Sequence, residues 1–307
     1  MKKNYFLFLA LYLLTFFVFQ GYAQQVQIIE TINLLSAGTN EYLMPKISPD
    51  GKKVAFSGKG HNGIFVTDYF GGDLKQITYY AAAGWNMKWS SSSDAITTRV
   101  NFWADDYKTK KSAVMLFDLQ GKEQNISSTL DEIGMPYWSE SGNSIWWEEK
   151  PMNFNSFNLK MNENEAAKIN NSTNIIEIKN GVPSISKPVE GEYLFVEWTP
   201  DYSKAAISVA GKGVFIYDTK TGKVYDFGLG EYPSWINNEQ LIFMVVKDDG
   251  YKIQDADIYC YTYDGKFLAD LTYGFDQPAL YPWASRDGKI VFQSLDGKIY
   301  KMQIHIK

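Results

Sequence analysis

Pro45-Lys46-Ile47-Ser48-Pro49-Asp50-Gly51 is the first and fullest copy of a phrase that recurs along the 307-residue chain. Later copies, complete or shortened, occupy residues 87–90, 136–139, 196–201, 233–236 and 282–288. The positions aligned with Ser48 are 48, 90, 139, 199, 236 and 285, so successive copies lie 37 to 60 residues apart. This spacing brackets the period of roughly 40 to 50 residues that is typical of propeller blades.

Each copy opens a unit in which strands and turns follow the same order. In the first unit we expect strands at residues 45–48, 54–57, 64–68 and 74–78. Asp50-Gly51 and Gly71-Gly72 lie between these strands and supply the positive φ that tight hairpins require. Six units of four short antiparallel strands predict an all-β, six-bladed β-propeller with WD-repeat-like blades.

The third unit is longer than the others, with 60 residues between its motif and the next. We expect its outer strand at residues 166–169, after a polar turn at 162–165. Residues 171–193 are then left over, and Ile175-Ile176-Glu177-Ile178 among them fits either an added edge strand or a folded loop. The sequence leaves both structures open.

The sixth unit ends at the alternating run of residues 300–306, before an outer strand. Residues 26–35, which are rich in Ile and precede the first motif, can supply that strand. Pairing of this kind removes an exposed sheet edge. We therefore expect the N-terminal strand to close the ring.

The third position of the motif is usually Trp. Trp89, Trp138, Trp198 and Trp235 occupy it, with Ile47 and Ala284 in the remaining copies. Large apolar side chains at a repeated strand position are usually buried. We interpret these residues as packing between adjacent blades, and not as a ligand-binding cluster.

The N-terminus has the features of an export signal. Lys2 and Lys3 precede an uncharged apolar run at residues 6–19, and Gly21-Tyr22-Ala23 offers small residues for a signal peptidase. The run is about 21 Å long as a helix, which is shorter than a membrane core of roughly 30 Å. We expect a signal peptide at residues 1–23 and a propeller at 24–307, without a membrane span after cleavage, as a monomer in the periplasm or outside the cell.

The charge balance bears on the class of partner, and the cysteine content bears on disulfide bonding. The chain has 30 Lys and Arg against 35 Asp and Glu, and its net charge is −5. This balance disfavours binding to nucleic acid, which needs a basic surface. Cys260 is the sole cysteine and lies in an alternating run, so we expect a buried free thiol.

No motif in the sequence indicates catalysis, a cofactor or a metal. The chain has two histidines, and it lacks a nucleophile elbow, a zinc-protease motif and a glycine-rich phosphate loop. Four aspartates at 248, 249, 255 and 257 have oxygen ligands that suit Ca²⁺, but their spacing is not that of a known calcium loop. We therefore expect no catalytic residues, no cofactor and no metal site.

The full repeat at residues 45–78, and its first half at 282–292, resemble the repeat of TolB-like six-bladed propellers. The resemblance covers residues 26–304 and implies the fold of these exported bacterial proteins. The shared positions are structural ones, so the resemblance transfers no binding residue to this chain.

Binding residues are expected on the face formed by the connections between blades and the loops between second and third strands. Aromatic residues precede several motif copies, and acidic residues lie in two of the loops. Aromatic and charged side chains of this kind are typical of binding surfaces. The candidate residues are Tyr42, Tyr80, Trp85, Asp105, Asp106, Tyr232, Asp248, Asp249 and Tyr281.

Two functions are compatible with this surface. The first hypothesis is a non-catalytic scaffold that binds a protein or peptide partner in the cell envelope. The alternative is an extracellular protein that binds or cleaves a glycan with the same aromatic and acidic loops. A structural interpretation is also open, in which the tyrosines cap the blade ends and the aspartates form turns.

Overall fold

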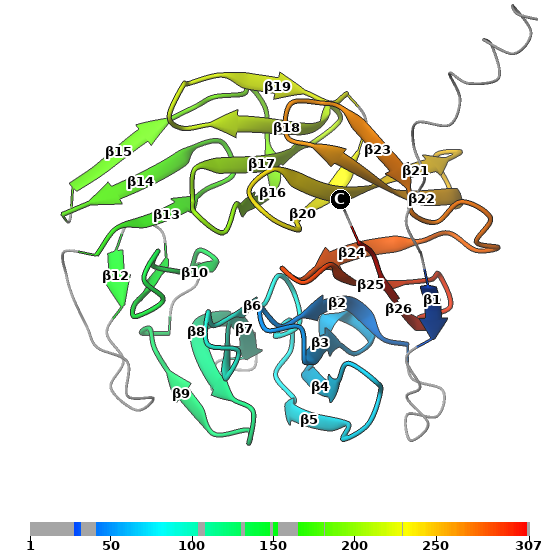
Figure 1. The fold of residues 1–307 in the computed structure, drawn as a ribbon. Coiled ribbons are helices and arrows are strands. Elements are labelled where there is room, and N and C mark those ends of the chain that lie inside the picture. Colours follow the sequence, from blue (N-terminus) through cyan, green and yellow to red (C-terminus); the bar gives the residue numbers. More distant parts are fainter. Residues whose placement is uncertain are drawn as a thin grey trace, which may run out of the picture.

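The computed structural model describes residues 28–31, 41–103, 108–129, 133–147, 150–152, 165–180, 182–228 and 230–305. Antiparallel sheets stand side by side in a ring (Figure 1), and residues of several inner strands line a channel at its centre. Apart from a short 3-10 turn at Lys59–His61, the regular elements described are strands. No helix among the described residues is long and apolar enough to cross a membrane. The predicted signal peptide at residues 1–23 lies outside the described residues.

The first two units each form one four-stranded sheet, in which the inner strand lies beside the channel. The strands of the first are β2 (Leu43–Ile47), β3 (Lys53–Ser57), β4 (Ile64–Asp68) and β5 (Lys75–Thr78). Those of the second are β6 (Lys88–Trp89), β7 (Ala95–Trp103), β8 (Lys110–Asp118) and β9 (Glu123–Asn125).

The fourth and fifth units repeat this arrangement. The fourth contains β16 (Tyr193–Trp198), β17 (Lys204–Val209), β18 (Gly213–Asp218) and β19 (Val224–Asp226). The fifth contains β20 (Glu231–Trp235), β21 (Gln240–Asp248), β22 (Ile253–Thr262) and β23 (Phe267–Asp270). Strands β21 and β22 form a long hairpin that ends near residues 248–252.

The ring closes as predicted. The sixth unit supplies β24 (Leu280–Ala284), β25 (Lys289–Gln293) and β26 (Ile299–Gln303). β1 (Ile28–Thr31) pairs antiparallel with β26 and completes the sheet, with Ile28 opposite Gln303 and Thr31 opposite Tyr300. Because the first and last parts of the chain share this sheet, the N-terminal strand fixes the end of the array.

The all-β, six-bladed propeller predicted from the repeat is confirmed, in that each of six units begins at a motif copy. The third unit supplies two three-stranded sheets, so the described residues form seven sheets in all. Its first sheet contains β10 (Pro136–Trp138), β11 (Ile145–Trp147) and β12 (Lys150–Met152). Its second contains β13 (Ala167–Asn170), β14 (Ile175–Lys179) and β15 (Val182–Ser186).

The second sheet of the third unit resolves the question left open by residues 171–193. Strand β14 is the middle strand of this sheet, which makes it neither an edge strand nor a loop. The expected outer strand at 166–169 corresponds to β13, which pairs with β14 and carries Lys168 on the channel wall. The prediction of four strands in every blade is therefore wrong for this unit among the described residues, because β13 begins a sheet of its own.

The motif folds into a turn that its hydroxyl and aspartate hold together. Ser48 Oγ donates to Asp50 Oδ1 at 2.6 Å, and Asp50 Oδ1 accepts the backbone N–H of Lys52 at 3.1 Å. Gly51 has φ of +68°, which favours glycine. Thr199 and Asp201 repeat the hydroxyl-to-carboxylate bond at 2.8 Å in the fourth unit.

The third unit lacks the aspartate of this turn, and Glu165 replaces it from a distant part of the chain. Its carboxylate accepts hydrogen bonds from the hydroxyls of Ser139 at 2.8 Å and Ser144 at 2.6 Å, and from Asn143 Nδ2 at 3.2 Å. These bonds outweigh partial burial and lower the pKa of Glu165. The same turn chemistry is thus achieved with a residue that no local motif contains.

The motif tryptophans join adjacent units, as predicted. Trp89 and Trp235 are 8% and 7% exposed. The indole Nε1 of Trp89 donates to Lys46 O of the preceding unit at 2.9 Å, and that of Trp235 donates to Glu197 O at 3.0 Å. Trp138 makes the corresponding bond to Lys88 O at 3.4 Å. Each indole therefore fixes the distance between two inner strands.

Candidate functional site

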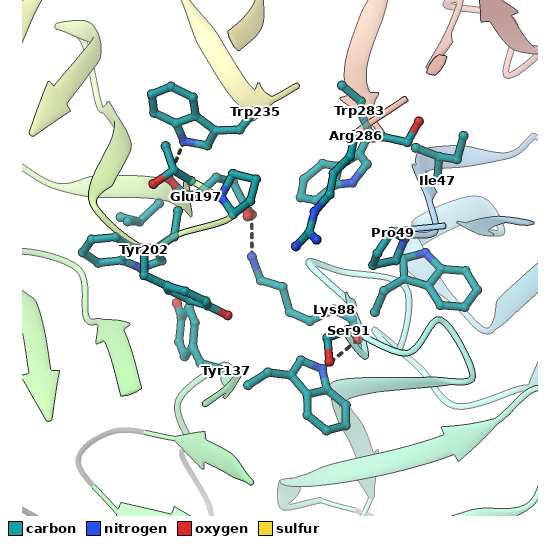
Figure 2. Close-up of a pocket in the computed structure, with 18 of the residues that line it drawn as sticks. Ile47, Pro49, Lys88, Ser91, Tyr137, Glu197, Tyr202, Trp235, Trp283 and Arg286 are labelled. Atoms are coloured by element: carbon teal, nitrogen blue, oxygen red, sulfur yellow. Dashed lines mark hydrogen bonds and ion pairs between the residues drawn. The ribbon is translucent and has the colours of Figure 1, made fainter. Parts of the chain in front are cut away.

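The channel contains a cavity of about 230 Å³, which we call the channel cavity (Figure 2). It lies toward the motif-turn face, the end of the ring formed by the turns that follow the inner strands. Side chains alternate along a strand, so the residue before each motif Trp points to the channel when the Trp packs sideways. Lys88, Tyr137 and Glu197 are wall residues at these positions, and Lys168 and Trp283 also line the wall.

An ion pair crosses the inner end of the cavity. Lys88 Nζ and Glu197 Oε1 are 2.5 Å apart, and the two side chains are 13% and 16% exposed. Figure 2 shows the Lys88 side chain reaching across the cavity toward Glu197. Trp283 lines both the channel cavity and a smaller cavity beside Tyr232 and Tyr281. We call Lys88, Glu197 and Trp283 the channel floor.

Lys46 lies beyond the channel floor and is only 4% exposed. Its Nζ donates to Asn86 Oδ1 at 3.2 Å and lies 3.9 Å from the centroid of the Trp283 ring. Burial, and then the positive charge of Lys88, lower the pKa of Lys46 to about 7, although Glu197 opposes the shift. A second ammonium therefore lies close to the ion pair.

Lys168 brings a further positive charge to the wall. Its Nζ donates to Tyr202 O at 2.6 Å, lies 4.9 Å from the Trp198 ring centroid, and has Glu177 Oε1 at 3.8 Å. Desolvation lowers the pKa of Lys168. The buried Nε1 of Trp198 has no hydrogen-bond partner among the described residues, unlike the indoles of the other motif tryptophans.

Arg286 and Tyr202 belong to motif turns at the mouth of the cavity. The Arg286 side chain points into the cavity in Figure 2, and no described carboxylate lies within ion-pair distance of its guanidinium. Tyr202 is half-buried, and desolvation raises the pKa of its phenol to about 12. Ser91 and Pro200 complete the rim.

Several predicted site residues cluster at the opposite end of the channel. The ring centroids of Phe195 and Tyr232 are 4.0 Å apart, those of Tyr232 and Tyr281 are 4.5 Å apart, and Trp85 lies 6.0 Å from Phe195. Tyr232 and Tyr281 have φ of +51° and +53°, where their inner strands begin with a β-bulge. A small cavity of about 10 Å³ lies beside Tyr232 and Tyr281, on the far side of the channel floor.

The other predicted site residues lie apart from this cluster. Tyr42 is 3% exposed and packs against Phe56 in the core, while Tyr80 donates its hydroxyl to Glu123 at 3.2 Å. Asp248 and Asp249 accept backbone N–H groups within the β21–β22 hairpin, and these bonds lower the pKa of Asp249. Asp105 and Asp106 lie outside the described residues.

Sequence reasoning missed the channel cavity because it assigned the motif to structure alone. Trp89, Trp138, Trp198 and Trp235 join the units and also form part of the cavity wall. The available signal was the variable residue before each Trp, which is Lys in one copy and Glu in another. Among the described residues, no group of three or more His, Cys, Asp or Glu side chains is arranged to hold a metal ion.

No family model matches the chain. A candidate Tricorn-like protease N-terminal subunit of Sulfurisphaera tokodaii is 33% identical over 86 residues, a match that spans 24% of this chain and 43% of that protein. The chain thus covers less than half the length of this curated relative.

Among solved structures, a candidate TolB from Agrobacterium tumefaciens has a TM-score of 0.52 at 14% identity and covers 92% of this chain and 99% of that chain. TolB from Acinetobacter baumannii has a TM-score of 0.49 at 16% identity and covers 74% of this chain and 53% of that chain. The first of these likenesses confirms the predicted TolB-like propeller fold. At this identity it is a likeness of fold alone.

Proposed function

We propose that this chain is an exported, non-catalytic propeller that binds a segment of a protein partner in the cell envelope, in the channel cavity. The observation that carries the proposal is the cavity of about 230 Å³, which combines an aromatic wall with charged side chains. Binding sites typically combine an apolar concave surface with a few polar groups that orient the ligand.

The charges of the wall favour an acidic segment. Lys88, Lys168 and Arg286 line the cavity with a single carboxylate, Glu197, which Lys88 already pairs. The chain as a whole carries a net charge of −5, so this local excess of positive charge contrasts with the rest of the molecule. A cleft with one sign of charge and poorly hydrated walls attracts ligands of the opposite sign.

The export part of the proposal rests on the sequence of residues 1–23. It includes cleavage of the signal peptide, a monomeric propeller at residues 24–307, and a location in the periplasm or outside the cell. The non-catalytic part of the proposal is supported by the sequence, which lacks a nucleophile elbow, a zinc-protease motif and a glycine-rich phosphate loop.

A pull-down from envelope extract tests the proposal. We expect the full-length protein to retain a defined partner, Arg286→Glu to lose it, and Tyr232→Ala with Asp249→Ala to keep it. The last two variants alter the opposite end of the ring. Loss of the partner with the loop variants and retention with Arg286→Glu would contradict the channel cavity as the site.

The glycan hypothesis has less structural support. A sugar ring needs an exposed aromatic face, whereas Phe195, Tyr232 and Tyr281 pack against one another. If the glycan hypothesis is right, affinity electrophoresis across polysaccharides will show retardation that Trp85→Ala or Tyr232→Ala removes.

A further inference from the structure

The channel cavity is closed at its inner end. Lys88 and Glu197 meet across the channel, and Trp283 lies at the same level. A second, smaller cavity of about 10 Å³, which is about the room for a single water molecule, lies beyond them. The ion pair and the Trp283 ring therefore lie across the path of a chain that enters at the motif-turn face.

A closed cavity discriminates between the end of a chain and its interior. An internal segment has to enter and leave by the same mouth, and two strands side by side need about 4.8 Å more width than one. A chain end needs room for one strand only. The shape of the cavity thus favours a terminus over a loop.

The charge of the wall selects between the two termini. An N-terminal ammonium would enter beside Lys88, Lys168 and Arg286, whereas a C-terminal carboxylate would have the opposite charge to all three. Arg286 is the cation best placed for this role, because its guanidinium points into the cavity and has no carboxylate partner among the described residues. Guanidinium groups bind carboxylates through two parallel hydrogen bonds.

We propose that the segment bound in the channel cavity is the free C-terminus of the partner, with its carboxylate on Arg286 and its last side chain against the motif tryptophans. This inference rests on the proposed function and names the chemistry of the partner. Lys168 adds to the attraction without leaving its hydrogen bond to Tyr202 O. The buried N–H of Trp198, which lacks an acceptor, offers a further donor on the same wall.

Three peptide libraries passed over the immobilised full-length protein test the inference. All are random hexapeptides: one acetylated with a free C-terminal carboxylate, one acetylated with a C-terminal amide, and one cyclised from head to tail. Mass spectrometry identifies the retained peptides, and calorimetry then measures their affinities. We expect members of the carboxylate library to be retained and to bind at least tenfold more tightly than their amides.

Arg286→Gln provides the decisive comparison. It should weaken binding of a retained carboxylate peptide by about tenfold to a hundredfold, as expected for loss of a charge-assisted hydrogen bond, and should leave the affinity of the amide unchanged. Lys220→Gln, an exposed change on the β18–β19 turn, is the matched control and should have no effect.

The alternative outcomes separate this inference from the proposed function. Equal retention of carboxylate, amide and cyclic peptides would overturn the chain-end inference and leave a peptide-binding cavity in place. The same holds if Arg286→Gln weakens carboxylate and amide alike. Retention of none of the libraries would overturn both.

Discussion

Neighbouring residues of the inner strands have separate roles. The indoles of Trp89, Trp138 and Trp235 bond to the preceding unit, whereas Lys88, Tyr137 and Glu197, each of which precedes a motif Trp, face the channel. Lys46 holds the corresponding position in the first motif, and with Lys88 and Glu197 it places two ammonium groups and one carboxylate in a poorly hydrated region. Burial of the second ammonium, on Lys46, costs stability unless its proton is released.

Lys46→Met should therefore change how stability depends on pH. The folded pKa of Lys46 is about 7, below its ordinary value of 10.5. Between these values the unfolded chain holds a proton that the folded protein releases, so this group makes stability rise with pH. The stability gained by Lys46→Met should be greatest at and below pH 7 and shrink toward pH 10. Urea unfolding of both proteins across this pH range measures the difference in their free energies of unfolding. A difference that does not vary with pH would contradict the lowered pKa of Lys46.

Trp235 tests the bond between units. Trp235→Ala should lower the free energy of unfolding by about 3 to 5 kcal/mol, as is usual for truncation of a buried aromatic side chain. Trp235→Phe keeps most of the packing but leaves Glu197 O without its donor, and should cost about 1 to 2 kcal/mol. Denaturant unfolding measures both, and a silent Trp235→Ala would place this side chain outside the core.

The motif turn is the element that explains the repeat. Its hydroxyl and carboxylate hold the backbone, and Gly51 provides a left-handed residue where the turn approaches the neighbouring unit. A Cβ atom on Gly51 would lie 2.8 Å from Asp287 Oδ1, which is too close. Gly222 has a similar φ of +72° in the β18–β19 turn, but a Cβ atom there would meet nothing within 4 Å.

This pair of glycines separates backbone strain from crowding. Gly222→Ala should cost about 1 to 2 kcal/mol for a left-handed residue with a side chain. Gly51→Ala should carry the same cost and a further destabilisation from the contact with Asp287. Thermal unfolding of both variants gives the comparison. If the two melting temperatures fall equally, the close approach of Gly51 to Asp287 does not affect stability.

The turn and strand of the third unit could not be predicted from the sequence motif alone. Asp and Gly mark the turn in the first unit, whereas the turn at Ser139 is completed by Glu165, which comes 26 residues later. Strand β13 has an inner-strand position but lacks the Pro and Gly of the motif. A search for the motif therefore does not identify Lys168 as a residue of the cavity wall. A local pattern predicts a turn or strand; it cannot predict a partner supplied from a distant segment.

At the scale of the whole molecule, the ring brings together residues that are far apart in the chain. Lys88 and Glu197 are separated by 109 positions and share an ion pair. The repeat predicted the ring and its closure, because most units carry the same order of strands and turns. The cavity could not be predicted in this way, since its volume depends on how inner strands from different units are spaced around the channel.

Removal of the closing strand should affect the whole ring. Deletion of residues 24–35 removes β1, which pairs with β26 along its full length. The exposed edge and the lost contacts should lower the melting temperature in one cooperative transition. Differential scanning calorimetry of the shortened and complete proteins measures this change. An unaltered melting temperature would mean that β1 adds nothing to the stability of the array.

The position of the partner on the ring is the most direct test of the central claim that the channel cavity is the binding site. A photo-crosslinking residue is placed either at position 91, on the rim of the cavity, or at position 251, which is 98% exposed at the tip of the β21–β22 hairpin on the opposite face. Both proteins are irradiated in envelope extract, and the cross-linked products are identified by mass spectrometry. We predict that the partner is captured from position 91 and not from position 251; capture from position 251 alone would contradict the claim.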